Sequence, residues 1–142
     1  MTTREAAVTA LVSLVSGAYA WGSPISRRLK LWGDVPLANR PACFVFSGGN
    51  QSYQWRQSVD PKRQLLIRLF IYTNAKDQSI VGATELDNIM DALDAALAPG
   101  PGRTMQTLGG LVAWARIDGE VLIEPGDLDG DGLAIVPIRI TL

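Results

Sequence analysis

The acidic side chains best placed to hold a cation lie in one short loop near the C-terminal end. The segment DLDGDG at residues 127–132 has acids at positions one, three and five and glycine at position six, as in the first half of a calcium loop. Position twelve is Ile138, where a calcium loop needs a bidentate glutamate, and a strand-like segment replaces the exiting helix. We expect a solvated turn that protects a sheet edge. A cation-binding module using Asp127, Asp129 and Asp131 is the alternative.

Catalytic chemistry has little support in the sequence. The chain contains no histidine, which excludes serine and cysteine triads, the usual zinc sites and the commonest general base. Asp87, Asp91 and Asp94 have i, i+4, i+7 spacing on the polar side of a predicted helix, where like charges repel one another. We expect no enzyme activity and no cofactor. The three acids are interpreted as a solvated face or as a docking surface for a basic partner.

Aromatic and basic residues cluster between residues 53 and 63. Tyr53, Trp55 and Arg56, followed by Lys62 and Arg63, could stack on single-stranded nucleic acid and neutralise it. No known nucleic-acid motif surrounds them, and the sequence pI of about 5.3 does not favour bulk binding. Trp, Tyr and Arg are also the residues that dominate protein–protein interfaces. We therefore expect a protein interface and no sequence-specific binding of nucleic acid.

Charge divides the chain into a basic and an acidic half. Residues 1–76 carry ten basic and three acidic side chains, net +7, whereas residues 77–142 carry three basic and eleven acidic ones, net −8. Either the two halves neutralise each other locally, or the subunit has a basic and an acidic face that join copies head to tail. In the second case Arg27, Arg28 and Lys30 are further interface candidates.

The composition is that of a single globular domain covering residues 1–142. Hydrophobic residues make up 47% and charged residues 19%, enough to build a core without a disulfide or a metal. The single cysteine, Cys43, lies in an apolar segment, so we expect a buried thiol. No apolar run is long enough to span a membrane, and the N-terminal segment lacks a signal-peptide pattern. We expect a soluble protein made in a cytoplasm, with no membrane partner.

Hydrophobic periodicity predicts two helices. Thr2 and Glu5 have capping-box spacing at the start of the first, and Gly17 and Gly22 mark its end. The second begins between residues 80 and 84 and ends at residue 98, before the APGPG sequence stops it. The apolar positions of the two helices are Ala7, Leu11, Leu14, Val15 and Ala18, and Leu86, Ile89, Met90, Leu93, Ala96 and Leu97.

Strand patterns and turn signals occupy most of the remaining chain. The Asp118-Gly119 pair predicts a two-residue hairpin between its flanking strands, and Pro137 predicts a sheet edge or a bulge. The fold class is therefore α+β, a mostly antiparallel twisted sheet with two helices packed on one face and a projecting hairpin arm. Residues 26–32 are predicted as a half-buried strand or a short basic extension. Further strands are predicted at residues 42–47, 64–73 (central), 111–117, 121–124 and 133–141, with a loop at 33–41 and an exposed arm or long loop at 50–63.

The order of these motifs resembles a known family over nearly the full length of the chain. The similarity includes WGD at residues 32–34 after a basic strand, RPA at residues 40–42 before a short one, and the acidic helix ELDNIMDALDAAL. It continues with the long strand at residues 64–73, QTLGGLV, RIDGEV and a closing VPIRITL. On these motifs the chain resembles the phage tail terminator proteins, also called minor tail protein U or tail completion proteins.

The resemblance implies a structural role in a virion. Tail terminators form a ring, commonly a hexamer, that caps the finished tail tube, stops its polymerisation and presents a surface to the head connector. The implied partners are copies of the same chain, the tail tube protein and head–tail connector proteins, at the head-proximal end of the tail. A head–tail connector or completion protein is the alternative within this class. A small cation- or ligand-binding module is the alternative from another class.

Overall fold

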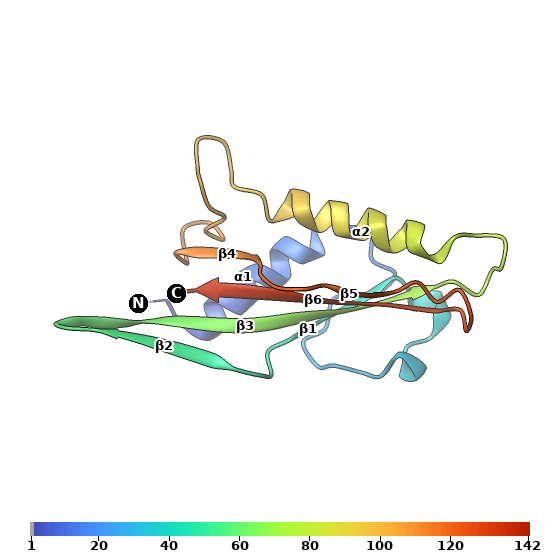
Figure 1. The fold of residues 1–142 in the computed structure, drawn as a ribbon, viewed down its shortest axis with the longest axis horizontal. Helices are drawn as coiled ribbons and strands as arrows, with labels where there is room; N and C mark the ends of the chain where they lie inside the picture. Colours follow the sequence, from blue (N-terminus) through green and yellow to red (C-terminus); the bar gives the residue numbers. More distant parts are fainter. Residues whose placement is uncertain (1) are drawn as a thin grey trace.

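The computed structural model describes residues 2–142 and consists of one β-sheet with two helices lying along it (Figure 1). Neither helix in this part of the chain has the length and apolarity of a membrane span. The predicted α+β class is confirmed. The helices are α1 (Arg4–Ser16) and α2 (Gly82–Ala96), the 3-10 turns are η1 (Trp32–Asp34) and η2 (Leu37–Asn39), and the strands are β1 (Ala42–Phe46), β2 (Gln51–Arg56), β3 (Val59–Asn74), β4 (Trp114–Ile117), β5 (Leu122–Glu124) and β6 (Asp131–Thr141).

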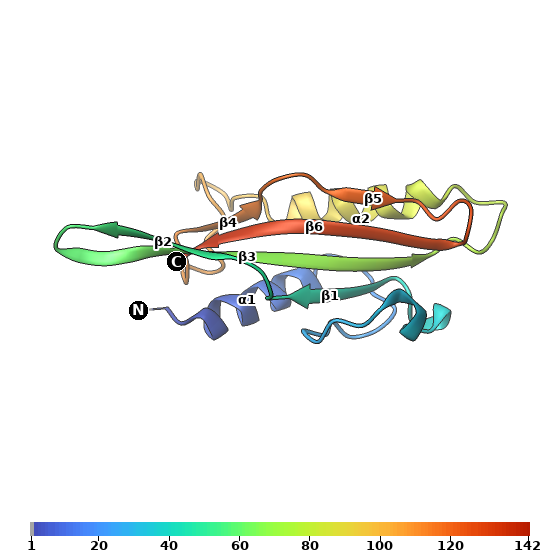
Figure 2. The ribbon, with the colours of Figure 1, turned by 60° about the horizontal axis from the view of Figure 1, so that its bottom comes forward.

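Two long central strands organise the sheet. β3 and β6 pair antiparallel over eleven residue pairs, from Gln64 opposite Thr141 to Asn74 opposite Asp131. β1 and β2 both pair with the outer edge of β3, and β4 and β5 both pair with the outer edge of β6. Each edge of the sheet is therefore one interrupted strand, and every pairing between the named strands is antiparallel (Figure 2).

Strand alternation places the main core between the sheet and both helices. On β3, Leu65, Ile67, Leu69 and Ile71 are buried, and the side chains between them are half-buried. The same alternation continues on β6, and Cys43 of β1 belongs to the same core, as expected. Both helices therefore cover one face of the sheet. They contribute Ala7, Val8, Leu11 and Val15 from α1, and Leu86, Ile89 and Leu93 from α2.

The face opposite the helices is partly open. At one end the segment before β1 folds over it, so that Val35 packs with Phe44 and Tyr72 in a second, smaller apolar cluster. Further along the sheet, side chains of this face such as Leu66 and Ile135 are only half-buried.

The strand predicted at residues 26–32 is not formed. This segment is a coil joined to β1 by a single parallel bridge between Ser26 and Phe44. The backbone contact with β1 is at Ser26, whose carbonyl accepts from Val45 N at 2.9 Å, whereas further along the segment a side chain binds the backbone: the Tyr72 hydroxyl donates to the Lys30 carbonyl at 2.6 Å. The prediction from local alternation was wrong for that reason.

The cap of α1 is shifted by one residue from its prediction. Thr3, not Thr2, is the N-cap, and its Oγ1 accepts a hydrogen bond from Ala6 N at 3.1 Å. With Thr3 as the N-cap, Glu5 is one position short of the N3 site that a capping box needs, and its carboxylate binds Arg27 at 2.7 Å. The helix ends at Gly17, as predicted.

The Asp118-Gly119 pair does not form the predicted hairpin. β4 pairs with residues 138–141 of β6 and β5 with residues 133–135, so the two strands lie end to end along β6. Pro137 lies opposite the gap between them, where its carbonyl accepts from Asp118 N at 3.0 Å. The N–H and the carbonyl of a strand residue point to the same side of the strand. Proline has no backbone N–H, and at Pro137 the missing donor would have pointed into the gap between β4 and β5. The ladder is irregular at Pro137, but β6 is a central strand and not an edge.

Candidate functional site

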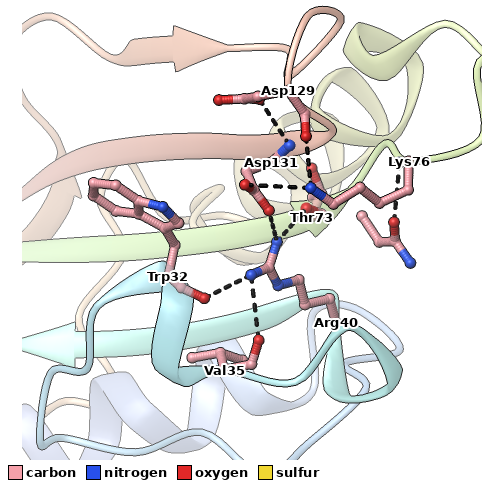
Figure 3. Close-up of polar contacts among 8 residues, drawn as sticks. Trp32, Val35, Arg40, Thr73, Lys76, Asp129 and Asp131 are labelled. Carbon is pink, nitrogen blue, oxygen red and sulfur yellow. Dashed lines mark hydrogen bonds and ion pairs between the residues drawn. The ribbon is translucent and has the colours of Figure 1, made fainter.

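Two cations of the protein itself fill the acidic loop (Figure 3). Asp131 accepts a hydrogen bond from Arg40 Nη1 through Oδ1 at 2.7 Å, and Lys76 Nζ lies 3.5 Å from its Oδ2. Lys76 Nζ also donates to the Asp129 carbonyl oxygen at 2.6 Å. The Asp131 carboxylate and the Asp129 carbonyl oxygen are therefore already occupied by a guanidinium and an ammonium group.

The three acids proposed as cation ligands do not act together. Asp127 turns toward the start of α2, where its Oδ1 accepts from Gly82 N at 3.3 Å. Asp129 closes a local turn, with its Oδ1 accepting from Asp131 N at 2.9 Å. Across the described residues, no group of three or more metal-binding side chains comes together. The geometry favours the expected turn over the cation-binding alternative.

Arg40 is the centre of this region. Its side chain is only 3% exposed, and its guanidinium also donates to the carbonyls of Thr73, Trp32 and Val35 at 3.2, 2.6 and 3.2 Å. The hydrogen bond from Arg40 lowers the pKa of the Asp131 carboxyl below its ordinary value. The loop before β1 is thereby tied to the ends of β3 and β6. We call Arg40, Lys76 and Asp131 the arginine clamp.

The segment predicted as an arm is a β-hairpin that projects beyond the end of the sheet in both views (Figures 1 and 2). It consists of β2 and the first part of β3, with a turn at Ser58 in the left-handed region at φ 64°. All six residues of β2 are exposed. Trp55 is 75% and Tyr53 50% exposed, and their rings stack with centroids 6.2 Å apart. Trp55 therefore does not cover the open face of the sheet.

The base of the arm is positively charged and hollow. Arg4, at the start of α1, donates to the Tyr53 hydroxyl and to Gln51 Oε1, the latter at 2.7 Å. Arg63 donates to the Thr2 carbonyl at 3.0 Å. Between them lies an open hollow of about 540 Å³. We call it the arm-base hollow; the charged and aromatic side chains that line it are Arg4, Tyr53, Arg56, Asp60, Lys62 and Arg63.

The charges around the hollow lack ion-pair partners in the described chain. Within residues 2–142, no acidic group lies within ion-pair distance of the four cations Arg4, Arg56, Lys62 and Arg63. The same holds, with signs reversed, for Asp87, Asp91 and Asp94, which are exposed on α2. The fold thus leaves Arg4, Arg56, Lys62 and Arg63 of the arm base and the three carboxylates of α2 without ion-pair partners within residues 2–142, whereas Arg27 pairs with Glu5.

The basic and acidic candidates lie on opposite sides of the molecule. Arg27 pairs with Glu5 of α1 at 2.7 Å, and exposed Arg28 and Lys30 follow it along the β1 edge. The α2 helix lies toward the other edge, near β4 and β5 (Figure 2). The +7 and −8 halves of the sequence therefore become two sides of the subunit as well as two halves of the chain.

Sequence reasoning missed the roles of Arg40 and Arg4. The partners of Arg40 lie 33 and 91 residues away, at Thr73 and Asp131, and Arg4 meets Tyr53 across 49 residues. No local spacing signals such contacts. Burial raises the pKa of Cys43 to about 12, so the one thiol is a core group and not a nucleophile.

Comparison with known proteins gives no relative to argue from, since no family model and no curated protein matches this chain. The candidate function consequently rests on the surfaces described above. They comprise a rigid internal clamp, an exposed basic arm and two sides of opposite charge.

Proposed function

We propose that this protein is a structural virion subunit of a tailed bacteriophage, a tail terminator. Copies form a hexameric ring that caps the tail tube, ends its polymerisation and presents the head-joining surface. The observation that carries the proposal is the separation of uncompensated charge: cations at the β1 edge and the arm, carboxylates on α2 toward the other edge. The order of motifs shared with tail terminators supports the same assignment.

Opposite charges on opposite sides favour a head-to-tail contact. Such a contact is heterologous, and it gives a closed ring when the rotation between neighbours closes. Charge complementarity then steers association and sets the register, while apolar and aromatic side chains supply most of the affinity. Trp55 and Tyr53 are available for that purpose because they are largely exposed on the arm. Ring assembly takes place in the host cytoplasm, and the finished ring lies at the head-proximal end of the tail.

The second candidate is a head–tail connector or completion protein. It would use the same charged sides to form a ring but would bind the head before the tail is joined. A cation- or ligand-binding module is the third candidate, and the filled acidic loop gives it less support. The three differ in behaviour: a terminator binds tube ends, a connector binds heads without tails, and a ligand module stays monomeric or dimeric.

The test is to mix the purified chain with tail tubes and image them by negative stain. A terminator gives rings on one tube end and prevents further elongation when tube subunits are added. Light scattering of the chain alone at tens of micromolar and low salt reports whether rings form without the tube. Absence of rings in both conditions, or unimpeded elongation of the tubes, would contradict the proposal.

A further inference from the structure

We infer that the arm-base hollow is the receptor for α2 of a second copy of this chain, with Asp87, Asp91 and Asp94 as the side chains it receives. This inference rests on the proposed function, because it names the contact from which the ring is built. Opposite charge on the two sides of the subunit would by itself permit many arrangements of neighbouring copies. The inference names one of them, in which α2 of one copy binds the arm base of the next.

Most of the charged side chains that line the arm-base hollow are cationic. Arg4, Arg56, Lys62 and Arg63 outnumber its one acid, Asp60. Arg4 and Arg63 are fixed by hydrogen bonds to uncharged groups, so both keep their charge uncompensated while losing part of their side-chain freedom. A cationic site with pre-ordered arginines favours carboxylates, because little further ordering is needed on binding.

Asp87, Asp91 and Asp94 form a straight acidic stripe along α2. Residues at i, i+4 and i+7 lie within one narrow face of a helix, and Asp87 to Asp94 spans about 10 Å of helix axis. In the arm, Lys62 is opposite Gln54, and Arg56 lies two residues further along β2 on the same face, which is about 7 Å. This spacing of two cations is close to the spacing of about 6 Å along the helix axis between Asp87 and Asp91.

The arm and α2 of the same copy are too far apart to touch each other. The arm projects from one end of the sheet, whereas α2 lies over the sheet toward the other end, in both views (Figures 1 and 2). The two segments can meet only between copies. Because the donor and the receptor are different surfaces, each copy can use both at once, as a ring requires.

Aromatic side chains beside the cations complete the fit. Trp55 and Tyr53 stack on one another and are exposed next to the hollow. Aromatic and arginine side chains together are typical of the residues that dominate protein interfaces. Single-stranded nucleic acid would use the same groups, but the acidic pI of the chain and the matching acidic stripe favour a second copy.

The direct test is zero-length cross-linking of the unmodified chain. A carbodiimide joins lysine amines to carboxylates that touch, and a mixture of unlabelled and nitrogen-15-labelled copies separates links between copies from links within one. We expect mixed-isotope peptides that join Lys62 to Asp87, Asp91 or Asp94. The Lys76–Asp131 pair, 3.5 Å apart, is the internal control and should link within single copies only. Formation of the control link without any Lys62–α2 link between copies would overturn the inference.

A charge-swap series tests the same contact energetically. Arg56→Glu and Asp91→Arg should each weaken self-association about tenfold, and the double variant in one chain should recover most of it. Arg103→Glu, the same change on an exposed loop outside the hollow, should change association less than about threefold. Equal effects of Arg56→Glu and Arg103→Glu, or no recovery in the double variant, would contradict the contact.

The outcomes separate this inference from the proposed function. If rings form on tube ends but no Lys62–α2 link is found, the terminator proposal stands and the proposed contact is wrong. If the links form between copies but no rings are seen, the contact stands and the ring proposal is wrong. Quenching of tryptophan fluorescence by a short oligothymidylate at physiological salt, abolished by Arg56→Glu, would assign the hollow to nucleic acid and overturn the inference.

Discussion

At one end of the sheet, Arg40 gives its hydrogen bonds to Asp131 and to three backbone carbonyls and is almost fully buried. At the other end, Arg4 and Arg63 bind uncharged groups, and Arg56 and Lys62 have no ion-pair partner within residues 2–142. The two ends use the same residue types in different ways.

The difference shows how burial and ion pairing distinguish an arginine that stabilises the fold from an arginine that is available to bind another molecule. A buried arginine must be paired, because an uncompensated charge in the interior costs several kcal/mol. An exposed arginine loses little by lacking a partner, since water solvates it, and it can still bind a partner that removes that water. The arginine clamp therefore stabilises the fold, while the cations of the arm-base hollow lack ion-pair partners within residues 2–142.

The largest effect is expected for Arg40→Ala. The substitution leaves the Asp131 carboxylate with Lys76 alone and removes one donor from each of three backbone carbonyls, of which the Trp32 carbonyl still accepts from Val35 N at 3.2 Å. We expect a loss of about 3–5 kcal/mol in the free energy of unfolding, the usual cost of breaking a buried pair. Chemical denaturation monitored by tryptophan fluorescence measures it.

The control for that experiment is Arg116→Ala. Arg116 pairs with Asp118 at 3.6 Å, but its side chain is 60% exposed. Exposed pairs contribute at most about 1 kcal/mol. Similar losses for Arg40→Ala and Arg116→Ala would mean that the clamp is not a distinct structural centre.

Asp131→Asn should lower the free energy of unfolding by a smaller amount that depends on pH. The Asp131 pKa is lowered in the folded state by its hydrogen bond with Arg40, from an ordinary value of 3.8. A lowered folded-state pKa gives stability that is complete above the unfolded-state pKa and is lost as the pH falls through the folded-state pKa. At neutral pH the variant should lose about 1.5–3 kcal/mol, the range for hydrogen bonds to charged groups.

The pH series supplies the check on this effect. Unfolding curves between neutral pH and about pH 3 should show the difference between wild type and Asp131→Asn shrinking as the carboxyl becomes protonated. A difference that stays constant across this range would show that the charge of Asp131 contributes nothing.

The clamp also shows where sequence reasoning reaches its limit. The periodicity of α2 is local, and its apolar face at Leu86, Ile89 and Leu93 was predicted correctly. The hairpin arm was anticipated for a related reason: a polar run between two apolar strands cannot be core. Arg40, by contrast, meets Asp131 across 91 residues, and only the assembled sheet brings the two together.

The wrong predictions have the same origin. An Asp-Gly pair between β-forming segments is a strong hairpin signal, yet β4 and β5 both pair with the long central strand β6 and not with each other. Likewise, the carbonyl of Lys30 binds Tyr72 instead of a strand. Local patterns predict the elements, but competition for long-range partners decides the pairing.

At the arm, substitution should leave the fold nearly unchanged. Trp55→Ala with Arg56→Ala removes exposed side chains, so the free energy of unfolding should change by no more than about 0.5 kcal/mol. Assembly on tubes should weaken about tenfold or more, because exposed Trp and Arg are typical interface anchors. Melting curves and quantitative tube-capping assays measure the two effects separately.

Hydrogen exchange provides the contrast between isolated and assembled states. Amides of residues 51–63 should exchange quickly in the monomer and slowly on the tube, since the arm is an exposed hairpin at the sheet's end. Strong protection of the arm in the monomer, together with a large fall in melting temperature for the double variant, would make the arm part of the fold.

No effect on stability is expected from calcium. The ion takes six to eight oxygen ligands, and the loop offers few: Asp131 and the Asp129 carbonyl already bind Arg40 and Lys76, and Asp127 faces α2. The side-chain cations would have to leave before a metal ion could enter, which removes the contacts that hold the loop before β1 to the sheet. Melting temperatures with millimolar calcium and with chelator should therefore coincide. A rise of several degrees with calcium, reversed by chelator, would show that the loop exchanges its internal cations for a metal ion and that the clamp is a binding site after all.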